Sequence, residues 1–382
     1  MNLKRKIIYL AGFLFSVPLA LTSYINSSYL KENISEYSVG ILYTVASILA
    51  ILFLFRMPKI LTRYGNRKFI IVSGLITLFS LALIALSENL YIIVGAFVIF
   101  FISSDLILAS LDIFVEDFST NKSIGRFRGM YLTFVNLAWV VSQMISGSII
   151  KKSSFAGIYL FSSLFIILMI LVFVLLLKNF KDPEYKRVSL LKTFKHIAKN
   201  SKLHKIYTIF FILKFFFAWM IIYTPIYLHE EIGFDWNQIG TIFSIMLLPF
   251  VLLTFPTGKL SDKIGEKKML ILGFVICSLF TLLIPFIGIK AVWIFAVILF
   301  MTRVGAALIE AMSEIYFFRI VSEEDADVIA FFKNTYPLSF VVAPLVATIT
   351  LLFLPHFSLL YPILSVVLLL GLILSLRLKD VK

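Results

Sequence analysis

Cysteine and histidine are both scarce in this 382-residue sequence, and each scarcity excludes a kind of site. The single cysteine, Cys277, lies inside an apolar run, so the chain has neither a disulfide framework nor a cluster of thiol metal ligands. The four histidines fall in predicted loops or at helix ends, and none has a metal-ligand partner at the usual spacing. We therefore expect no bound metal and no cofactor.

Phosphate-binding signatures are also missing from the sequence. It contains no glycine-rich phosphate loop and no stretch that reads as a nucleotide-binding domain. Energy from ATP is therefore not expected, and no catalytic arrangement of side chains is apparent. The sequence indicates that the protein is not an enzyme.

Charge is the third scarcity, and it decides the class of protein. Only 15% of residues are charged and 60% are hydrophobic, whereas a soluble domain has about 25% charged and about 45–50% apolar residues. The mean hydropathy is +1.01. A water-soluble fold is excluded, and the length fits about twelve membrane crossings of about 20 residues each.

The apolar runs predict an all-α membrane protein with twelve transmembrane helices. The runs are too long for barrel strands, and lipid permits only helices or closed barrels. The first run is longer than the apolar region of a signal peptide, about 7–15 residues, so we interpret it as a retained helix. The predicted helices cover 7–28, 39–56, 69–87, 90–111, 130–150, 157–178, 206–228, 238–257, 269–288, 291–312, 328–354 and 357–376.

Basic residues in the loops predict the orientation. Nearly all loop lysines and arginines fall on the side that holds both termini, and the positive-inside rule makes that side cytoplasmic. The opposite side holds only Lys31, Lys151, Lys152 and Lys290. We expect a multi-pass protein of the cytoplasmic (inner or plasma) membrane. Its net charge of +14 then faces anionic lipid and requires no nucleic-acid partner.

The sequence divides into two similar halves. The longest loop separates six predicted helices from six, and each half has a basic turn containing glycine between its second and third helices. These turns, 58–68 and 258–268, lie 200 residues apart, which indicates an internal repeat of six helices. We predict an N-terminal lobe over 1–185, a cytoplasmic amphipathic linker over 186–205 and a C-terminal lobe over 206–382.

The second turn, GKLSDKIGEKK, resembles the cytoplasmic signature of the major facilitator superfamily. The matching residues are Gly258, Leu260, Asp262, Lys263, Gly265, Lys267 and Lys268. The first turn matches at Arg63, Gly65, Arg67 and Lys68 but has Pro58 and Thr62 in place of the first glycine and the aspartate. With the twelve-helix plan, the resemblance spans the whole chain. It implies two six-helix lobes that rock in alternating access around a central cavity lined by helices one, four, seven and ten.

The deepest charges within the predicted helices, Asp105, Lys214, Arg303 and, nearer the cytoplasm, Glu310, fall on that cavity-lining set. A charge at the bilayer centre costs at least about 2.5–3.5 kcal/mol, so each one should face protein or water and serve a purpose. We assign Asp105, Lys214 and Arg303 to the central cavity, with Ser104, Tyr24 and Trp219 as polar or aromatic neighbours.

Three interpretations of Asp105 are open. It could carry a proton as the cavity alternates between wet and dry, pair permanently with Lys214 or Arg303, or bind a cationic substrate. The two cations could likewise bind a carboxylate or phosphate of the substrate, or serve only in structural pairs.

A second group of residues is predicted to form the cytoplasmic gate. Carboxylates and cations at the ends of adjacent helices can pair in one conformation and separate in another. Asp112 and Glu314 occupy nearly equivalent positions of the two repeats. The predicted gate residues are Gly258, Asp262, Lys263, Gly265, Lys267, Arg63, Gly65, Arg67, Asp112, Glu310 and Glu314.

These features favour a secondary active transporter that moves a small organic solute. Proton coupling is favoured, as symport or antiport, and the expected partners are the solute, protons and membrane lipids, with the protein acting as a monomer. A uniporter, a lipid flippase and a non-transporting membrane sensor on the same scaffold are the alternatives, because a fold alone does not fix a function.

Overall fold

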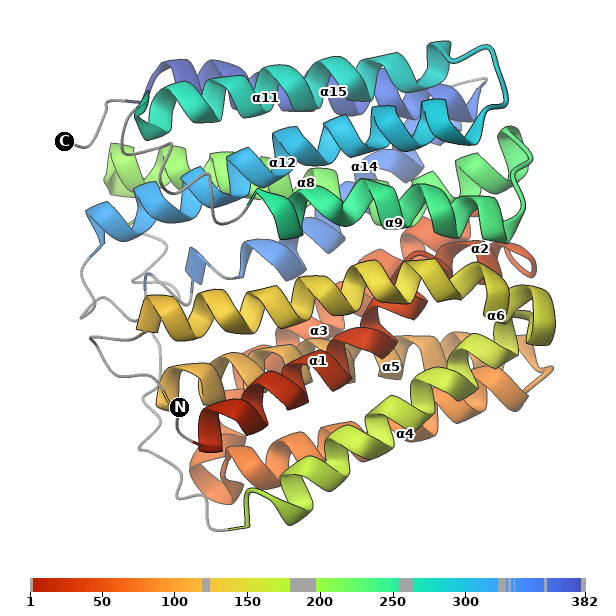
Figure 1. The fold of residues 1–382 in the computed structure, drawn as a ribbon, viewed down its shortest axis with the longest axis vertical. Helices are drawn as coiled ribbons and strands as arrows, with labels where there is room; N and C mark the ends of the chain where they lie inside the picture. The colour runs from red at the N-terminus through yellow and green to blue at the C-terminus, as the bar shows by residue number, and fades with distance from the viewer. Residues whose placement is uncertain are drawn as a thin grey trace. The chain divides into compact units, whose positions relative to one another are not determined.

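The computed structural model describes the chain as helices joined by short turns (Figure 1). The described residues are 3–118, 124–178, 197–253, 264–321, 328, 331–332, 334–353 and 356–378. No strand occurs within these ranges, in agreement with the predicted all-α fold. The chain divides into two compact units: unit 1 is Met1–Arg187 with Asp235–Gly240, and unit 2 is Val188–Phe234 with Thr241–Lys382.

Unit 1 contains the first six predicted crossings. Its helices are α1 (Leu3–Ser23), α2 (Asn26–Lys31), α3 (Glu36–Tyr64), α4 (Asn66–Leu86), α5 (Leu90–Asp117) and α6 (Ile124–Leu175). The 52-residue α6 is two helices, because Ser153 (φ −142°, ψ 18°) and Ser154 (φ 56°, ψ −169°) leave helical geometry. Within the unit α1 packs along α6, α5 packs against α3 and α4, and α4 also packs against α6.

Unit 2 contains the remaining crossings. Its helices are α8 (Ser201–Ile226), continued by a π-helical turn (Tyr227–Glu231), α9 (Trp236–Leu252, whose first residues group with unit 1), α11 (Glu266–Leu283), α12 (Val292–Ile320), α14 (Thr335–Phe353) and α15 (Leu360–Leu376). Here α11 packs against α12 and α15, and α8 packs against α14, α15 and α12.

The helices have the length and composition of membrane crossings. Ten helical stretches among the described residues are long and apolar enough to span a bilayer, and one of them is the kinked α6. The shorter α9, of 17 residues, is also apolar. With α6 divided at its kink and α9 included, the helices fit the twelve predicted crossings. The protein is a multi-pass membrane protein.

Apolar side chains lie on the outside of each unit and small polar ones lie inside. Tyr91, Phe353 and Leu86 are 87%, 81% and 73% exposed, as lipid-facing residues should be. Between helices, Thr77 on α4 donates a hydrogen bond to Ser103 on α5 (2.8 Å), and Gln143 on α6 donates one to the carbonyl oxygen of Ala20 (2.6 Å). Small residues and interhelical hydrogen bonds replace the hydrophobic effect in holding membrane helices together.

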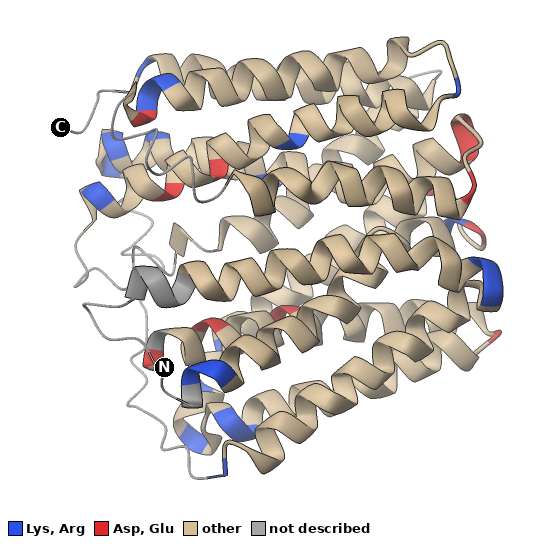
Figure 2. Cartoon of the chain, viewed as in Figure 1, with Lys and Arg blue, Asp and Glu red and all other residues tan. Residues whose placement is uncertain are grey.

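Helix ends differ from the sequence-based prediction at the basic turns. Predicted helix 39–56 continues to Tyr64 as α3, and predicted helix 291–312 continues to Ile320 as α12. The added turns carry arginine and lysine. The apolar stems of these side chains can lie along the helix while their charged groups reach water, so a helix can continue through such residues. Figure 2 shows the result: within each unit, lysine and arginine lie mainly near helix ends.

Helices α11 and α12 pack closely against each other in unit 2. A Cβ atom on Gly305 would lie 2.6 Å from the amide nitrogen of Cys277 and 2.6 Å from the carbonyl oxygen of Gly273. A Cβ atom on Gly273 would in turn lie 2.9 Å from the carbonyl oxygen of Gly305. The two glycines therefore allow the backbones of α11 and α12 to touch, as small residues do in membrane helix pairs.

Candidate functional site

Asp105 lies inside unit 1, on the middle part of α5. Its side chain is buried (9% exposed), and its Oδ2 atom has no hydrogen-bond partner among the described residues. The hydroxyl of Ser104 beside it is also buried without a partner there, whereas Ser103 is already bonded to Thr77 and to the carbonyl oxygen of Phe100. A buried carboxylate without a partner is costly, so its retention requires an explanation.

Lys214 and Glu310 form an ion pair inside unit 2. The Nζ atom of Lys214 on α8 lies 2.5 Å from Oε1 of Glu310 on α12, with side chains 12% and 29% exposed. The ammonium group also lies 4.5 Å from the ring centre of Phe210 and 5.2 Å from that of Phe217. The structure thus joins a predicted cavity residue to a residue predicted for the gate.

Arg303 lies two turns before Glu310 on α12, a rise of about 10 Å. It is 1% exposed, and its Nη1 atom has no hydrogen-bond partner in the described part of the chain. The guanidinium group lies over the rings of Phe216 and Phe217, 4.9 and 5.7 Å from their centres. Ring faces offset only part of the cost of burying a cation, so Arg303 is a desolvated cation with an unused hydrogen-bond donor.

The predicted aromatic neighbours divide between the two units. In unit 1 Tyr24 follows the last residue of α1, is 3% exposed and lies edge-on to Trp139 of α6. In unit 2 Trp219 is fully buried on α8 between Phe215 and Tyr223, and its indole Nε1 has no partner among the described residues.

Gly65 and Gly265, one from each predicted turn, adopt similar backbone conformations. Gly65 (φ 78°, ψ 157°) ends α3 and precedes α4, and Gly265 (φ 90°, ψ 147°) precedes α11. Positive φ favours glycine, which explains its presence at both positions. The motif residues Gly258, Leu260, Asp262 and Lys263 lie outside the described residues.

The basic residues of the first turn serve unit 1 itself. Arg67 donates hydrogen bonds from Nε to the carbonyl oxygen of Phe173 (3.0 Å) and from Nη2 to that of Val174 (3.1 Å), at the C-terminal end of α6. A cation there complements the helix dipole. Arg63 is exposed and stacks over Tyr64.

The other predicted gate residues, Lys267 on α11, Asp112 on α5 and Glu314 on α12, are half-buried. Both acids have partners in the structure. Nothing described here tests a gating role for any of them, and that role stays a prediction.

Comparison with known proteins identifies the family. The family model described as Major Facilitator Superfamily matches residues 8–237 and 216–382, which together cover nearly the whole chain. The chain belongs to the major facilitator superfamily. Its members are transporters, so this protein is a membrane transporter and not an enzyme.

Solved structures with the same fold include two crystal structures of a POT family transporter. One, in complex with a thioalcohol-conjugated peptide, has a TM-score of 0.77, and the other, in complex with 5-aminolevulinic acid, has a TM-score of 0.78. Each is 12% identical in sequence, and each match covers 98% of this chain and 94% of the other. No curated protein matches the sequence. At this identity the likeness shows the fold alone.

Sequence reasoning missed the polar junctions that follow the two turn glycines of this major facilitator protein. After Gly65, the fully buried Asn66 donates to the carbonyl oxygen of Ser110 (3.1 Å) and accepts from its hydroxyl (2.6 Å). After Gly265, the buried Glu266 pairs with Arg319 of α12. The signal was available, because Asn66 and Glu266 are polar residues at equivalent repeat positions in front of apolar runs.

Separating Lys214 from its partner is expected to destabilise unit 2. In Glu310→Gln the ammonium group loses its counter-charge in a largely apolar site, which we expect to cost about 2 kcal/mol and to lower Tm measurably. Thermal unfolding of the purified protein in detergent measures the change. Glu88→Gln, which removes an exposed negative charge in the connection between α4 and α5, is the control and should have little effect. Equal shifts in the two variants would contradict this interpretation of the pair.

Proposed function

We propose that this protein is a proton-coupled secondary transporter of a small organic solute that carries a carboxylate group. It would work by alternating access in the cytoplasmic membrane, with both termini in the cytoplasm. The observation that carries the proposal is Asp105, a buried carboxylate with an unpartnered oxygen on a membrane-spanning helix. The loop charge bias supports the orientation.

The environment of Asp105 supports proton coupling. Burial favours the neutral acid and contact with water favours the carboxylate, so a change in hydration drives proton binding and release. A carboxylate locked in an ion pair would resist that exchange, and the described residues give Asp105 no such pair. An ionisable group inside a membrane helix commonly marks an ion pathway.

The substrate class is suggested by Arg303. Guanidinium groups bind carboxylates through two parallel hydrogen bonds, and this one is desolvated with an open Nη1. Lys214 is less available, because Glu310 neutralises it. One of the similar solved structures contains 5-aminolevulinic acid, a small molecule of the same chemical class.

Proton flux into liposomes tests the proposal. The purified chain would be reconstituted in vesicles containing a pH-sensitive dye and challenged with small amino and keto acids, and with the matching amides. We expect internal acidification or alkalinisation with the acids and little with the amides, and none in protein-free vesicles. If labelled acids equilibrate without moving protons, the protein is a uniporter. If only labelled lipid moves, it is a flippase; either result overturns the coupled mechanism.

Substitution of Arg303 tests the substrate class separately. We expect Arg303→Gln to raise KM for the transported acid about tenfold or more, because a charged hydrogen bond of about 1.5–3 kcal/mol is lost. The same variant should unfold at a higher temperature than the native protein, since a buried unpaired cation is removed. Arg303→Lys keeps the positive charge but lacks the planar guanidinium group, and its KM should lie between those of the native protein and Arg303→Gln. Unchanged KM in Arg303→Gln would exclude this residue from recognition.

A further inference from the structure

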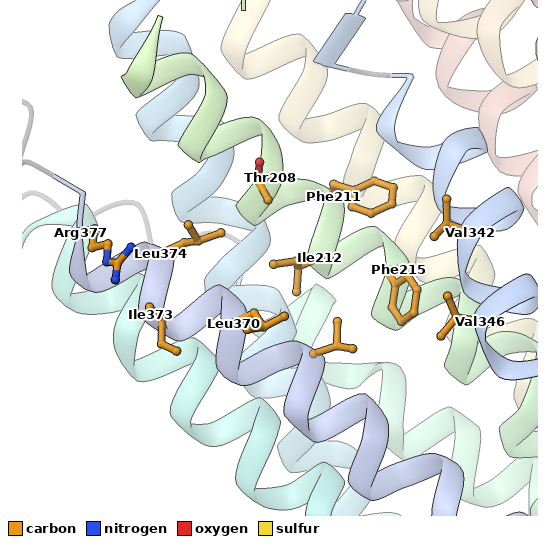
Figure 3. Close-up of a pocket in the computed structure, with 11 residues that line it drawn as sticks. Thr208, Phe211, Ile212, Phe215, Val342, Val346, Leu370, Ile373, Leu374 and Arg377 are labelled. Carbon is orange, nitrogen blue, oxygen red and sulfur yellow. The ribbon is translucent and has the colours of Figure 1, made fainter. Parts of the chain in front are cut away.

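A groove on unit 2 lies apart from the charged residues described above. Helices α14 and α15 both pack against α8 but make little contact with each other, which leaves an opening of about 540 Å³ in front of α8. Phe211 and Phe215 of α8 form its floor, and Val346 of α14 and Leu370 of α15 form its sides (Figure 3). Val367 of α15 also lines it. Its size is that of a small-molecule pocket, about 300–1,000 Å³.

The groove is apolar along its length and basic at one end. Among the described residues of its lining, the polar side chains are Thr208 and Arg377, and Arg377 is exposed just after the last residue of α15 (Figure 3). Lys205, in the first turns of α8, donates a hydrogen bond from Nζ to the carbonyl oxygen of Arg377 (3.2 Å) and so brings a second cation to this end. No acidic residue occupies the first turn of α8.

The surroundings of the groove indicate which kind of molecule would occupy it. Leu370 and Ile373 on its rim are 53% and 45% exposed, on a helix that spans the membrane. The groove therefore opens toward hydrocarbon. A soluble metabolite or a peptide would leave most of its polar groups unpaired against this lining. An amphiphile with a long apolar chain and an anionic head matches both the lining and the charge.

We propose that the groove between α8, α14 and α15 binds one anionic phospholipid of the membrane, with an acyl chain along α8 and the phosphate at Arg377. Guanidinium binds phosphate bidentately, and the Lys205 ammonium adds attraction at the same end. The bound lipid would join two helices that touch little by themselves. This proposal does not depend on the transported substrate.

Lipid binding by the purified full-length protein tests the site. The protein in neutral detergent would be titrated with phosphatidylglycerol, with phosphatidylcholine and with inorganic phosphate, and bound lipid would be counted by native mass spectrometry alongside thermal unfolding. We expect one tightly bound phosphatidylglycerol and a higher Tm. Arg377→Gln should weaken binding about fivefold or more, and Val367→Trp should abolish it by filling the groove.

Two control variants match these changes. Arg56→Gln removes an exposed arginine on α3, and Val366→Trp places the same large side chain on α15 at a 59% exposed position outside the groove lining. Both should bind phosphatidylglycerol as the native protein does. The proposal is overturned if phosphatidylcholine binds equally well, if inorganic phosphate gives the whole thermal shift, or if Val366→Trp and Val367→Trp lose lipid to the same extent.

Discussion

Asp105→Asn is expected to abolish proton-driven accumulation of solute while leaving solute exchange across the membrane intact. Asparagine has nearly the size of aspartate and can hydrogen-bond, but it cannot bind and release a proton. Because the described residues hold Asp105 in no ion pair, its loss should not disturb packing in unit 1. The measurement compares uphill uptake driven by a pH gradient with counterflow of labelled solute in the same liposomes.

The controls for Asp105 separate coupling from folding. Asp105→Glu keeps a titratable group one methylene longer and should retain part of the uphill uptake. Ser104→Ala removes the neighbouring unpartnered hydroxyl and should leave coupling in place. If Asp105→Asn still accumulates solute against its gradient, the proton carrier is another group. If exchange and uptake disappear together in a folded variant, Asp105 binds the solute.

The second large effect is expected at the contact between α11 and α12. In Gly305→Leu the new side chain meets backbone atoms of Gly273 and Cys277, which cannot rotate away as a flexible side chain would. Extra methylene groups in a packed interior cost about 1–3 kcal/mol, and here the helix axes themselves must separate. We expect little folded protein after purification, and for Gly305→Ala a clearly lowered Tm.

A glycine in open space provides the matched control. Gly95 lies on α5, and a Cβ atom there would meet nothing within 4 Å. Gly95→Ala should therefore be neutral or slightly stabilising, by about 0.5–1 kcal/mol, because alanine favours the helix more than glycine does. Size-exclusion profiles and thermal unfolding of Gly305→Ala and Gly95→Ala would measure the difference. Equal behaviour would mean that α11 and α12 do not need this contact.

The sequence predicted the crossings better than their ends. Hydropathy locates a helix such as α5 because lipid imposes a minimum apolar length. Hydropathy does not predict the helix ends at Tyr64 and Ile320. Arginine and lysine lower the hydropathy as loop residues do, although their charged groups can reach water from a continuing helix. It also could not foresee the positive φ of Ser154, which depends on how the two parts of α6 pack. The glycine turns were recognisable because their spacing repeats.

For the candidate site, the sequence identified the charged residues but not their partners. The sequence assigned Arg303 to the cavity and Glu310 to the gate, yet only the rotation of α8 against α12 brings Glu310 to Lys214. Partner choice depends on helix rotations of a few tens of degrees, which periodicity does not fix. For the same reason the pairing of Glu266 with Arg319 was missed.

The two junctions behind Gly65 and Gly265 differ in how they should respond to solvent. Asn66 and Ser110 are neutral and buried, so neither dissolved ions nor acid has a charge to act on. Glu266 and Arg319 attract each other as ions; the arginine side chain is 40% exposed and the glutamate side chain 3%, so high ionic strength screens the pair in part, from the arginine side. Raising the ionic strength should therefore weaken the junction of the second repeat to some extent and leave that of the first repeat unchanged, so the two copies of one architecture should differ in their response to salt.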